Sequence, residues 1–144
     1  MTELDKILLT SATTIVGGIF VYSIGRIIEK FLIEPLYEYR KTIGLITDNL
    51  IFYANTYSNP TVSSKEDKDE ASKTLRRLSS ELTSRMYLIP FYKCFSLFKI
   101  IPNYSSSINA SSSLIGLSNA LYNNDYTNIE NKINNIEICL NIKT

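Results

Sequence analysis

The stretch from residue 7 to residue 25, ILLTSATTIVGGIFVYSIG, decides the fold of this chain. Lys6 and Arg26 bracket it, and no charged residue lies between them. As an α-helix with a rise of about 1.5 Å per residue, the stretch would be roughly 28 Å long, close to the ~30 Å hydrocarbon core of a bilayer. We therefore expect one transmembrane helix near the N-terminus.

Two other interpretations of this stretch are open. Its Thr, Ser and Gly content is also compatible with a buried helix of a protein core. Residues 23–25 (SIG) could pass as the small-residue cleavage site of a signal peptide. The acidic Glu3 and Asp5 ahead of the stretch, and the apolar Ile27 and Ile28 after it, favour a retained span.

Six small or hydroxyl-bearing residues fall on one side of the expected helix. At about 100° per residue, bulkier residues such as Ile15 and Phe20 fall on the other side. In lipid, small residues let helix backbones approach closely, and hydroxyls can hydrogen-bond across the contact. The face predicts a homo-oligomer, and a ring of such faces could line a pore. The alternative is that these residues are simply tolerated in a span. The face consists of Thr10, Ser11, Thr14, Gly17, Gly18 and Gly25.

The distribution of basic residues predicts the orientation of the span. The N-terminal flank offers Lys6 and the terminal amine, and the more positively charged flank stays in the cytoplasm. We therefore expect an inner-membrane protein, in contact with lipid, whose C-terminal body is cytoplasmic. The unpaired Cys94 and Cys139 suit a reducing compartment. The basic residues that follow the span are Arg26, Lys30, Arg40 and Lys41.

The rest of the chain has helical periodicity and predicts an all-α fold. Pro35 is expected to kink or break the helix near Glu34, so we divide the chain into a membrane segment, 1–35, and a helical bundle, 36–144. No stretch alternates at period two. We predict a compact cytoplasmic bundle of four to five helices.

Local signals place the elements of this bundle. The patterns Ser63-x-x-Glu66 and Thr127-x-x-Glu130 are typical of capping boxes at helix starts. The segment 91–101, FYKCFSLFKII, is either a buried helix or a helix on the inner membrane surface. The helix expected over 64–89 has an apolar line made of Ala71, Leu75, Leu78, Leu82 and Ile89.

The composition excludes several classes of chemistry. The chain has 15 Lys+Arg and 14 Asp+Glu, no His, no Trp and two Cys. His-based triads and His-ligated zinc are therefore excluded, and two Cys are too few for a Cys-only zinc site or a disulfide scaffold. We expect no catalytic residue, no metal and no cofactor, and we expect Cys94 and Cys139 to be small buried apolar residues.

A basic cluster in the 64–89 helix is a candidate contact for an anion or a partner. The acidic Glu70 and Glu81 are interleaved with it, which favours an ion-paired surface over nucleic-acid binding. The carboxylates of Glu29, Glu34 and Glu38 are likewise expected to pair with neighbouring basic residues. The cluster consists of Lys73, Arg76, Arg77 and Arg85.

The chain resembles small bacterial membrane proteins with one N-terminal span and a helical cytoplasmic domain. The stretches that carry the resemblance are LIEPLYEYRKTIG, FYAN, LRRLSSEL, RMYLIPFY and LIGLSNAL. In domain order and size it is also loosely similar to ring-forming membrane accessory proteins of RNA-targeting CRISPR systems. Those proteins join a span to a degenerate endoribonuclease-like bundle, and the likeness implies a membrane pore in antiphage defence. It implies no nuclease activity here, because the chain has no His.

These observations lead to a hypothesis of function. We expect a non-enzymatic, homo-oligomeric membrane protein that forms a pore or permeabilises the membrane, as an antiphage-defence effector. The alternative is a membrane-tethered adaptor whose bundle binds a protein partner without forming a pore. A membrane-bound enzyme is a third interpretation, and no activated nucleophile or base in the sequence favours it.

Overall fold

The computed structural model describes residues 2–123 and 125–144, and its only regular secondary structure in these ranges is helix. The predicted all-α class is therefore confirmed. The elements are α1 (Glu3–Ile28), η1 (Glu29–Ile33), α2 (Glu34–Phe52), α3 (Ala54–Ser58), α4 (Lys65–Leu88), α5 (Tyr92–Leu97), α6 (Tyr104–Asn123) and α7 (Tyr126–Leu140).

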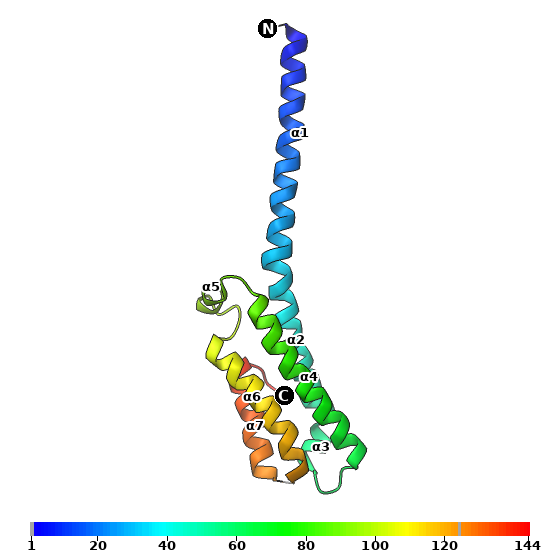
Figure 1. Cartoon of the computed structure of the whole chain (residues 1–144). Helices are drawn as coiled ribbons and strands as arrows, with labels where there is room; N and C mark the ends of the chain where they lie inside the picture. The colour runs from blue at the N-terminus through cyan, green and yellow to red at the C-terminus, as the bar shows by residue number, and fades with distance from the viewer. Residues whose placement is uncertain (1, 124) are drawn as a thin grey trace.

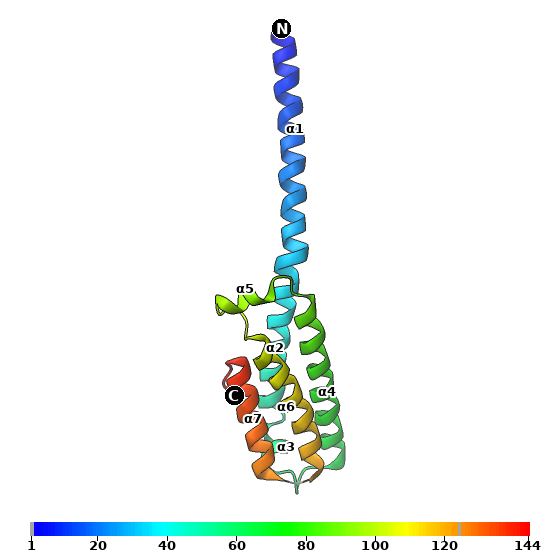
Figure 2. The same ribbon diagram turned by 60° about the vertical axis from the view of Figure 1, so that its left-hand side comes forward.

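The molecule consists of a helical shaft and a body of packed helices. Figure 1 shows α1 rising out of the body, with the N-terminus at its free end and the C-terminus beside the body. In the body, α4 packs against both α2 and α6, and α6 packs against α7 (Figure 2). The short α3 lies at the end of the body away from α1, and α5 lies at the end next to it.

The shaft makes no core of its own. Every described residue of α1 is exposed, and no side chain of the body covers it. The interpretation of this stretch as a buried core helix is therefore wrong. The continuous helix Glu3–Phe52 is the one helix of the described chain that is long and apolar enough to cross a membrane.

The helix does not break at Pro35, so the predicted break is wrong, whereas the kink predicted as its alternative stays a prediction. The turn just before Pro35, η1, is a π-helical turn, in which the N–H of Glu34 donates to the carbonyl of Glu29. A proline ring clashes with the carbonyl four residues earlier in an α-helix, and a widened turn relieves this clash. The chain therefore runs from α1 into α2 as one helix, with Pro35 in the first turn of α2.

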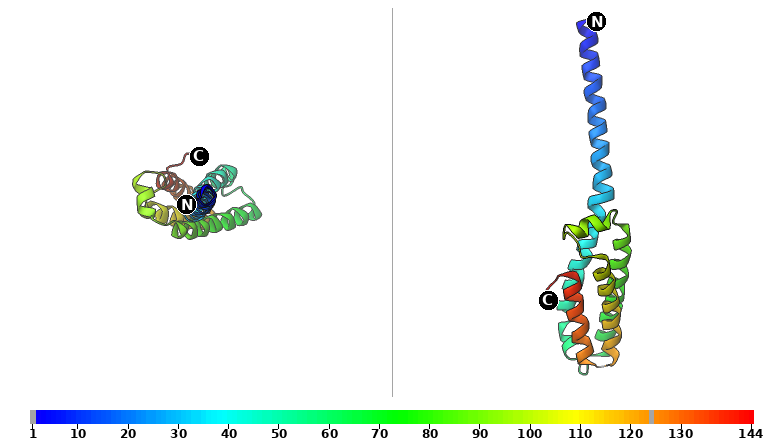
Figure 3. Two further views of the ribbon diagram at one scale, coloured as in Figure 1. Left: turned by 90° about the horizontal axis from the view of Figure 1, so that it is seen from above. Right: turned by 90° about the vertical axis from the view of Figure 1, so that its left-hand side faces the viewer.

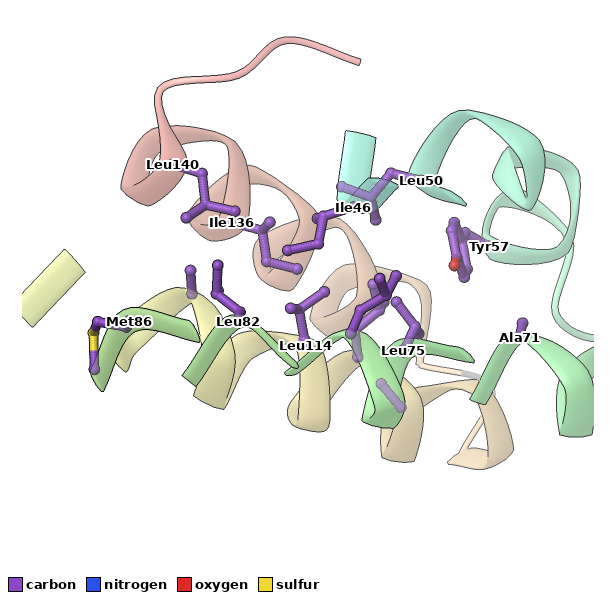
Figure 4. Packing of buried hydrophobic residues seen from close by; sticks show 14 of the residues in the cluster. Ile46, Leu50, Tyr57, Ala71, Leu75, Leu82, Met86, Leu114, Ile136 and Leu140 are labelled. Carbon is purple, nitrogen blue, oxygen red and sulfur yellow. The ribbon is translucent and has the colours of Figure 1, made fainter. Parts of the chain in front are cut away.

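Burial begins only after Pro35. From Tyr39 onward, α2 buries one face against α4, so the predicted boundary after residue 35 falls inside a continuous helix, just before the buried part. Figure 4 shows Ile46, Leu82, Leu114 and Ile136 pointing toward one another from four different helices. The apolar line predicted in the 64–89 helix is confirmed, since all five of its members are buried: Ala71, Leu75, Leu78, Leu82 and Ile89.

Two predicted helix starts are displaced. The cap of α4 is Ser64, whose hydroxyl accepts from the N–H of Asp67 at 3.0 Å, whereas Ser63 donates to the carbonyl of Asn59. The cap of α7 is Asp125, which accepts from the N–H of Asn128 at 3.1 Å, so α7 begins ahead of the predicted box at Thr127. In both places a nearby Ser or Asp can also cap the helix, and the spacing of a capping box cannot choose between such neighbours.

The aromatic segment 91–101 is not a core helix. None of the residues of α5 is buried, and Ile101 is the buried residue of the segment. Cys94, which was expected to be buried, is exposed on α5, and Cys139 on α7 is partly buried. The expectation for Cys94 is therefore wrong, because it followed the general tendency of free cysteine to be buried and not the position of this segment.

Candidate functional site

The small-residue face of α1 is open along its length. Apart from the neighbouring residues and the nearby backbone of the helix itself, no described atom lies within 4 Å of the position that a Cβ would occupy at Gly17, Gly18 or Gly25. Nothing within the chain therefore fills the space beside these glycines. The other members of the predicted face, Thr10, Ser11 and Thr14, are also exposed on α1.

The threonine hydroxyls of α1 are satisfied within the helix. Thr10, Thr13 and Thr14 donate to main-chain carbonyls one turn earlier, at 2.8, 2.8 and 2.9 Å. Such bonds remove much of the cost of placing a hydroxyl in lipid, where no water can supply a partner. The hydrophobicity of α1 is also nearly even around its circumference. The face therefore differs from the rest of α1 in size of side chain more than in polarity.

The basic residues that follow the span do not form one cluster. Arg26 pairs with Glu29 at 2.9 Å, and Lys41 lies 3.6 Å from Glu38. These pairs agree with the predicted ion pairing of the neighbouring carboxylates. The side chains of Lys30 and Arg40 are exposed.

Arg85 is the polar link between α2 and α4. Its Nη1 donates to the carbonyl of Glu38 and to the hydroxyl of Thr42, both at 2.8 Å, and lies 2.9 Å from a carboxylate oxygen of Glu38. Its Nη2 lies 3.7 Å from Glu81, as the i,i+4 spacing predicts. The contacts with α2 could not be read from the sequence, because Glu38 and Arg85 lie far apart along it.

The rest of the predicted basic cluster points in different directions. Arg76 donates to the side chain of Asn119 on α6 at 2.7 Å, and Arg77 donates to Glu81 on its own helix at 2.9 Å. Lys73 is exposed. The structure thus brings only Arg77 and Arg85 together, through their shared partner Glu81.

Hydroxyl groups join α4 to α6 inside the body, which the sequence analysis did not foresee. The hydroxyl of Ser79 lies 2.7 Å from that of Ser111 and donates to its carbonyl at 2.9 Å. The hydroxyl of Thr83 lies 2.8 Å from that of Ser111. Small buried serines let two helices pack closely while their hydroxyls stay hydrogen-bonded. The available signal was the run of serines in α6.

Two buried tyrosines have different surroundings. The hydroxyl of Tyr39 lies 2.6 Å from that of Ser107 and 3.4 Å from that of Tyr92. The hydroxyl of Tyr57 has no hydrogen-bond partner among the described residues. Burial raises the pKa of both hydroxyls well above the ordinary tyrosine value, so both stay protonated at neutral pH.

A hollow of about 650 Å³ lies between α2, the α5–α6 loop and the end of α7. Its polar lining includes Arg40, Lys99 and Asn103, and Cys139 faces it. Burial raises the pKa of the Cys139 thiol, which makes it a poor nucleophile at neutral pH. Across the described residues, no three His, Cys, Asp or Glu side chains come together as metal ligands.

Comparison with known proteins gives no further guide, because no protein-family model, no curated protein and no solved structure matches this chain. Two features of the structure are candidates for a functional site. One is the open face of α1, and the other is the end of the body next to α1, where α5 lies.

Proposed function

We propose that the protein is a homo-oligomeric, single-span inner-membrane protein with a cytoplasmic body, and that its assembled spans permeabilise the membrane. The observation that supports this most is that α1 leaves the body with all its described residues uncovered, including the small-residue face. In lipid there is no hydrophobic drive for helices to associate, so close packing of small residues has to supply the attraction. A single helix encloses no space, so permeation requires a ring.

A membrane-tethered adaptor is the second candidate function. It is favoured by the even hydrophobicity of α1 and by the threonine hydroxyls that are satisfied within the helix, since both leave little polarity for a water-filled channel. In an adaptor, a partner would bind exposed apolar residues of the body. Ile51 and Phe52 at the far end of α2 are such residues.

Gly18 provides the test of the homo-oligomer. It lies near the middle of the span, between Ser11 and Gly25 on the same face. In Gly18→Leu, the new side chain would hold neighbouring backbones apart, while insertion would improve because leucine favours the hydrocarbon core. We expect normal membrane levels, a smaller particle mass in detergent by light scattering, and loss of ion leak from loaded liposomes.

Ile19→Leu is the matched control, because Ile19 lies on the opposite, bulky side of α1 and is also exposed. It should change neither particle mass nor leak. If both variants keep the wild-type mass, the small-residue face is not an interface, and the proposal that the spans assemble through it into a pore fails. If Gly18→Leu shrinks the particle while the wild-type protein shows no leak, the protein assembles without permeabilising, and the adaptor is favoured.

A further inference from the structure

The segment from Phe91 to Ile100, here called the α5 segment, has two distinct sides. Tyr92 and Phe95 are partly buried and pack against the core of the body. Phe91, Leu97 and Phe98 point away from it and are 74%, 80% and 73% exposed. Three large apolar side chains thus meet solvent within one short segment.

The position of the α5 segment is as important as its composition. It lies at the end of the body from which α1 leaves, to one side of the base of the shaft, and it runs crosswise to the direction of the shaft (Figures 2 and 3). If α1 crosses the bilayer, this end is the part of the body nearest the membrane. A segment lying crosswise to the shaft there would run along the membrane surface.

The α5 segment is held in this position by specific contacts. The hydroxyl of Tyr92 donates to the carbonyl of Pro102 at 2.8 Å and lies 2.8 Å from the hydroxyl of Ser107. Its ring meets the ring of Tyr39 edge-on, with centroids 6.2 Å apart. The exposed apolar side is therefore presented by an anchored element.

The backbone has an unusual conformation at both ends of α5. Phe91 and Lys99 have φ angles of 52° and 57°, in the left-handed region that non-glycine residues rarely adopt. These two residues bracket α5, at the points where the chain enters and leaves it.

The charge of this region matches a lipid surface. No acidic residue occurs between Glu81 and Asp125, whereas Lys93 and Lys99 lie within the α5 segment. Both lysine side chains are exposed. Basic residues beside exposed aromatic and aliphatic ones are typical of elements that lie in the interface of a membrane with anionic headgroups.

We propose that the α5 segment is a second membrane contact, in which Phe91, Leu97 and Phe98 enter the interfacial layer of the bilayer while Lys93 and Lys99 meet anionic headgroups. This rests on the membrane span of the proposed function, but not on pore formation or on any oligomer. The contact would hold the body against the inner surface instead of leaving it to swing below a single helix.

The absence of tryptophan from the chain makes a direct test available. Three single-tryptophan variants of the full chain are reconstituted into vesicles of phosphatidylcholine and phosphatidylglycerol that contain brominated lipids, which quench nearby indole fluorescence. Phe98→Trp reports on the α5 segment. Phe52→Trp is the matched control, because Phe52 is 76% exposed but lies at the far end of the body, and Phe20→Trp reports on the span.

We expect strong quenching of Phe98→Trp by lipids brominated near the headgroup, quenching of Phe20→Trp by lipids brominated deep in the chains, and none for Phe52→Trp. If Phe98→Trp behaves like Phe52→Trp while Phe20→Trp is quenched, the α5 proposal is overturned and the span stands. If Phe20→Trp is also unquenched, the span itself fails.

Two further measurements test whether protein covers the segment instead of lipid, and whether the lysines contribute to the contact. Protection of Phe98→Trp from acrylamide without quenching by lipid would place the segment against protein, such as a second copy, and would overturn the proposal. Adding Lys93→Glu and Lys99→Glu should weaken the lipid quenching severalfold in anionic vesicles. If quenching is unchanged by these substitutions, the assignment of anionic headgroups is wrong.

Discussion

The hydroxyl groups of Tyr39 and Tyr57 are both buried, yet only one of them is hydrogen-bonded within the described chain. A typical intramolecular hydrogen bond contributes about 1 kcal/mol to stability, whereas a buried polar group without a partner costs about 1–3 kcal/mol. Removing the two hydroxyls should therefore have opposite effects on the free energy of unfolding.

We predict that Tyr39→Phe lowers the unfolding free energy by about 1 kcal/mol and that Tyr57→Phe raises it by a similar amount. The check is thermal unfolding of the full chain in detergent, followed by circular dichroism, with the melting temperature falling in the first variant and rising in the second. The two substitutions remove the same atom, so each is the control for the other. Equal losses of stability would show that the hydroxyl of Tyr57 is hydrogen-bonded in solution.

At the scale of single elements, α2 is the joint between shaft and body. Its buried residues begin at Tyr39, and α4 covers them, so the part of the chain before Pro35 adds nothing to the core. Arg85 then fixes α4 to α2 through Glu38 and Thr42. The core is complete without α1.

We predict that a chain beginning at Leu36 folds without the span. It keeps every buried residue of the body, so its far-ultraviolet circular dichroism should be dominated by helix and its thermal unfolding should be cooperative. A chain beginning at Leu50 is the control, because it loses Tyr39, Thr42 and Ile46 and leaves one face of α4 uncovered. A spectrum dominated by sheet, or equal behaviour of the two chains, would contradict this account of the core.

The sequence predicted the helices of the body well because their apolar periodicity has one physical cause, the burial of one face. Leu75, Leu78 and Leu82 all lie where this pattern placed them. The caps were misplaced because a hydroxyl or carboxylate at either of two neighbouring positions can accept the same N–H groups. Local rules of this kind fix the presence of a helix better than its first residue.

Long-range features were the ones that the sequence could not supply. The ion-paired surface around Glu81 was foreseen, whereas the contacts of Arg85 with α2 were not. The position of the α5 segment was left open, because an aromatic run has the same pattern whether protein or lipid covers it. Pro35 was expected to disrupt an α-helix, and a widened turn avoided the break.

At the scale of the whole molecule, the proposed orientation places the two ends of the shaft on opposite sides of the membrane. Thr2 would face the periplasm, and α5 would lie on the cytoplasmic side. Both positions are exposed, and Cys94 is a natural thiol on α5.

We predict that a membrane-impermeant maleimide labels a Thr2→Cys variant, with Cys94 and Cys139 replaced by serine, in cells whose inner membrane is intact. The wild-type Cys94 should react only after that membrane is permeabilised. Gel shift of the labelled protein is the measurement. Labelling of Cys94 in intact cells, without labelling at position 2, would reverse the orientation.

The continuity of the helix from Glu3 to Phe52 has a consequence for any assembly made through α1. Because hydrogen-bonded backbone connects the shaft to the body without a loop, the small-residue face of α1 and the buried face of α2 keep a fixed angle to each other about the helix axis. The widened turn at η1 helps to set that angle, since an extra residue in one turn rotates everything after it. In a symmetric ring, every body would then present the same side to the central axis, and a twist of the bodies would be transmitted to the spans as torsion.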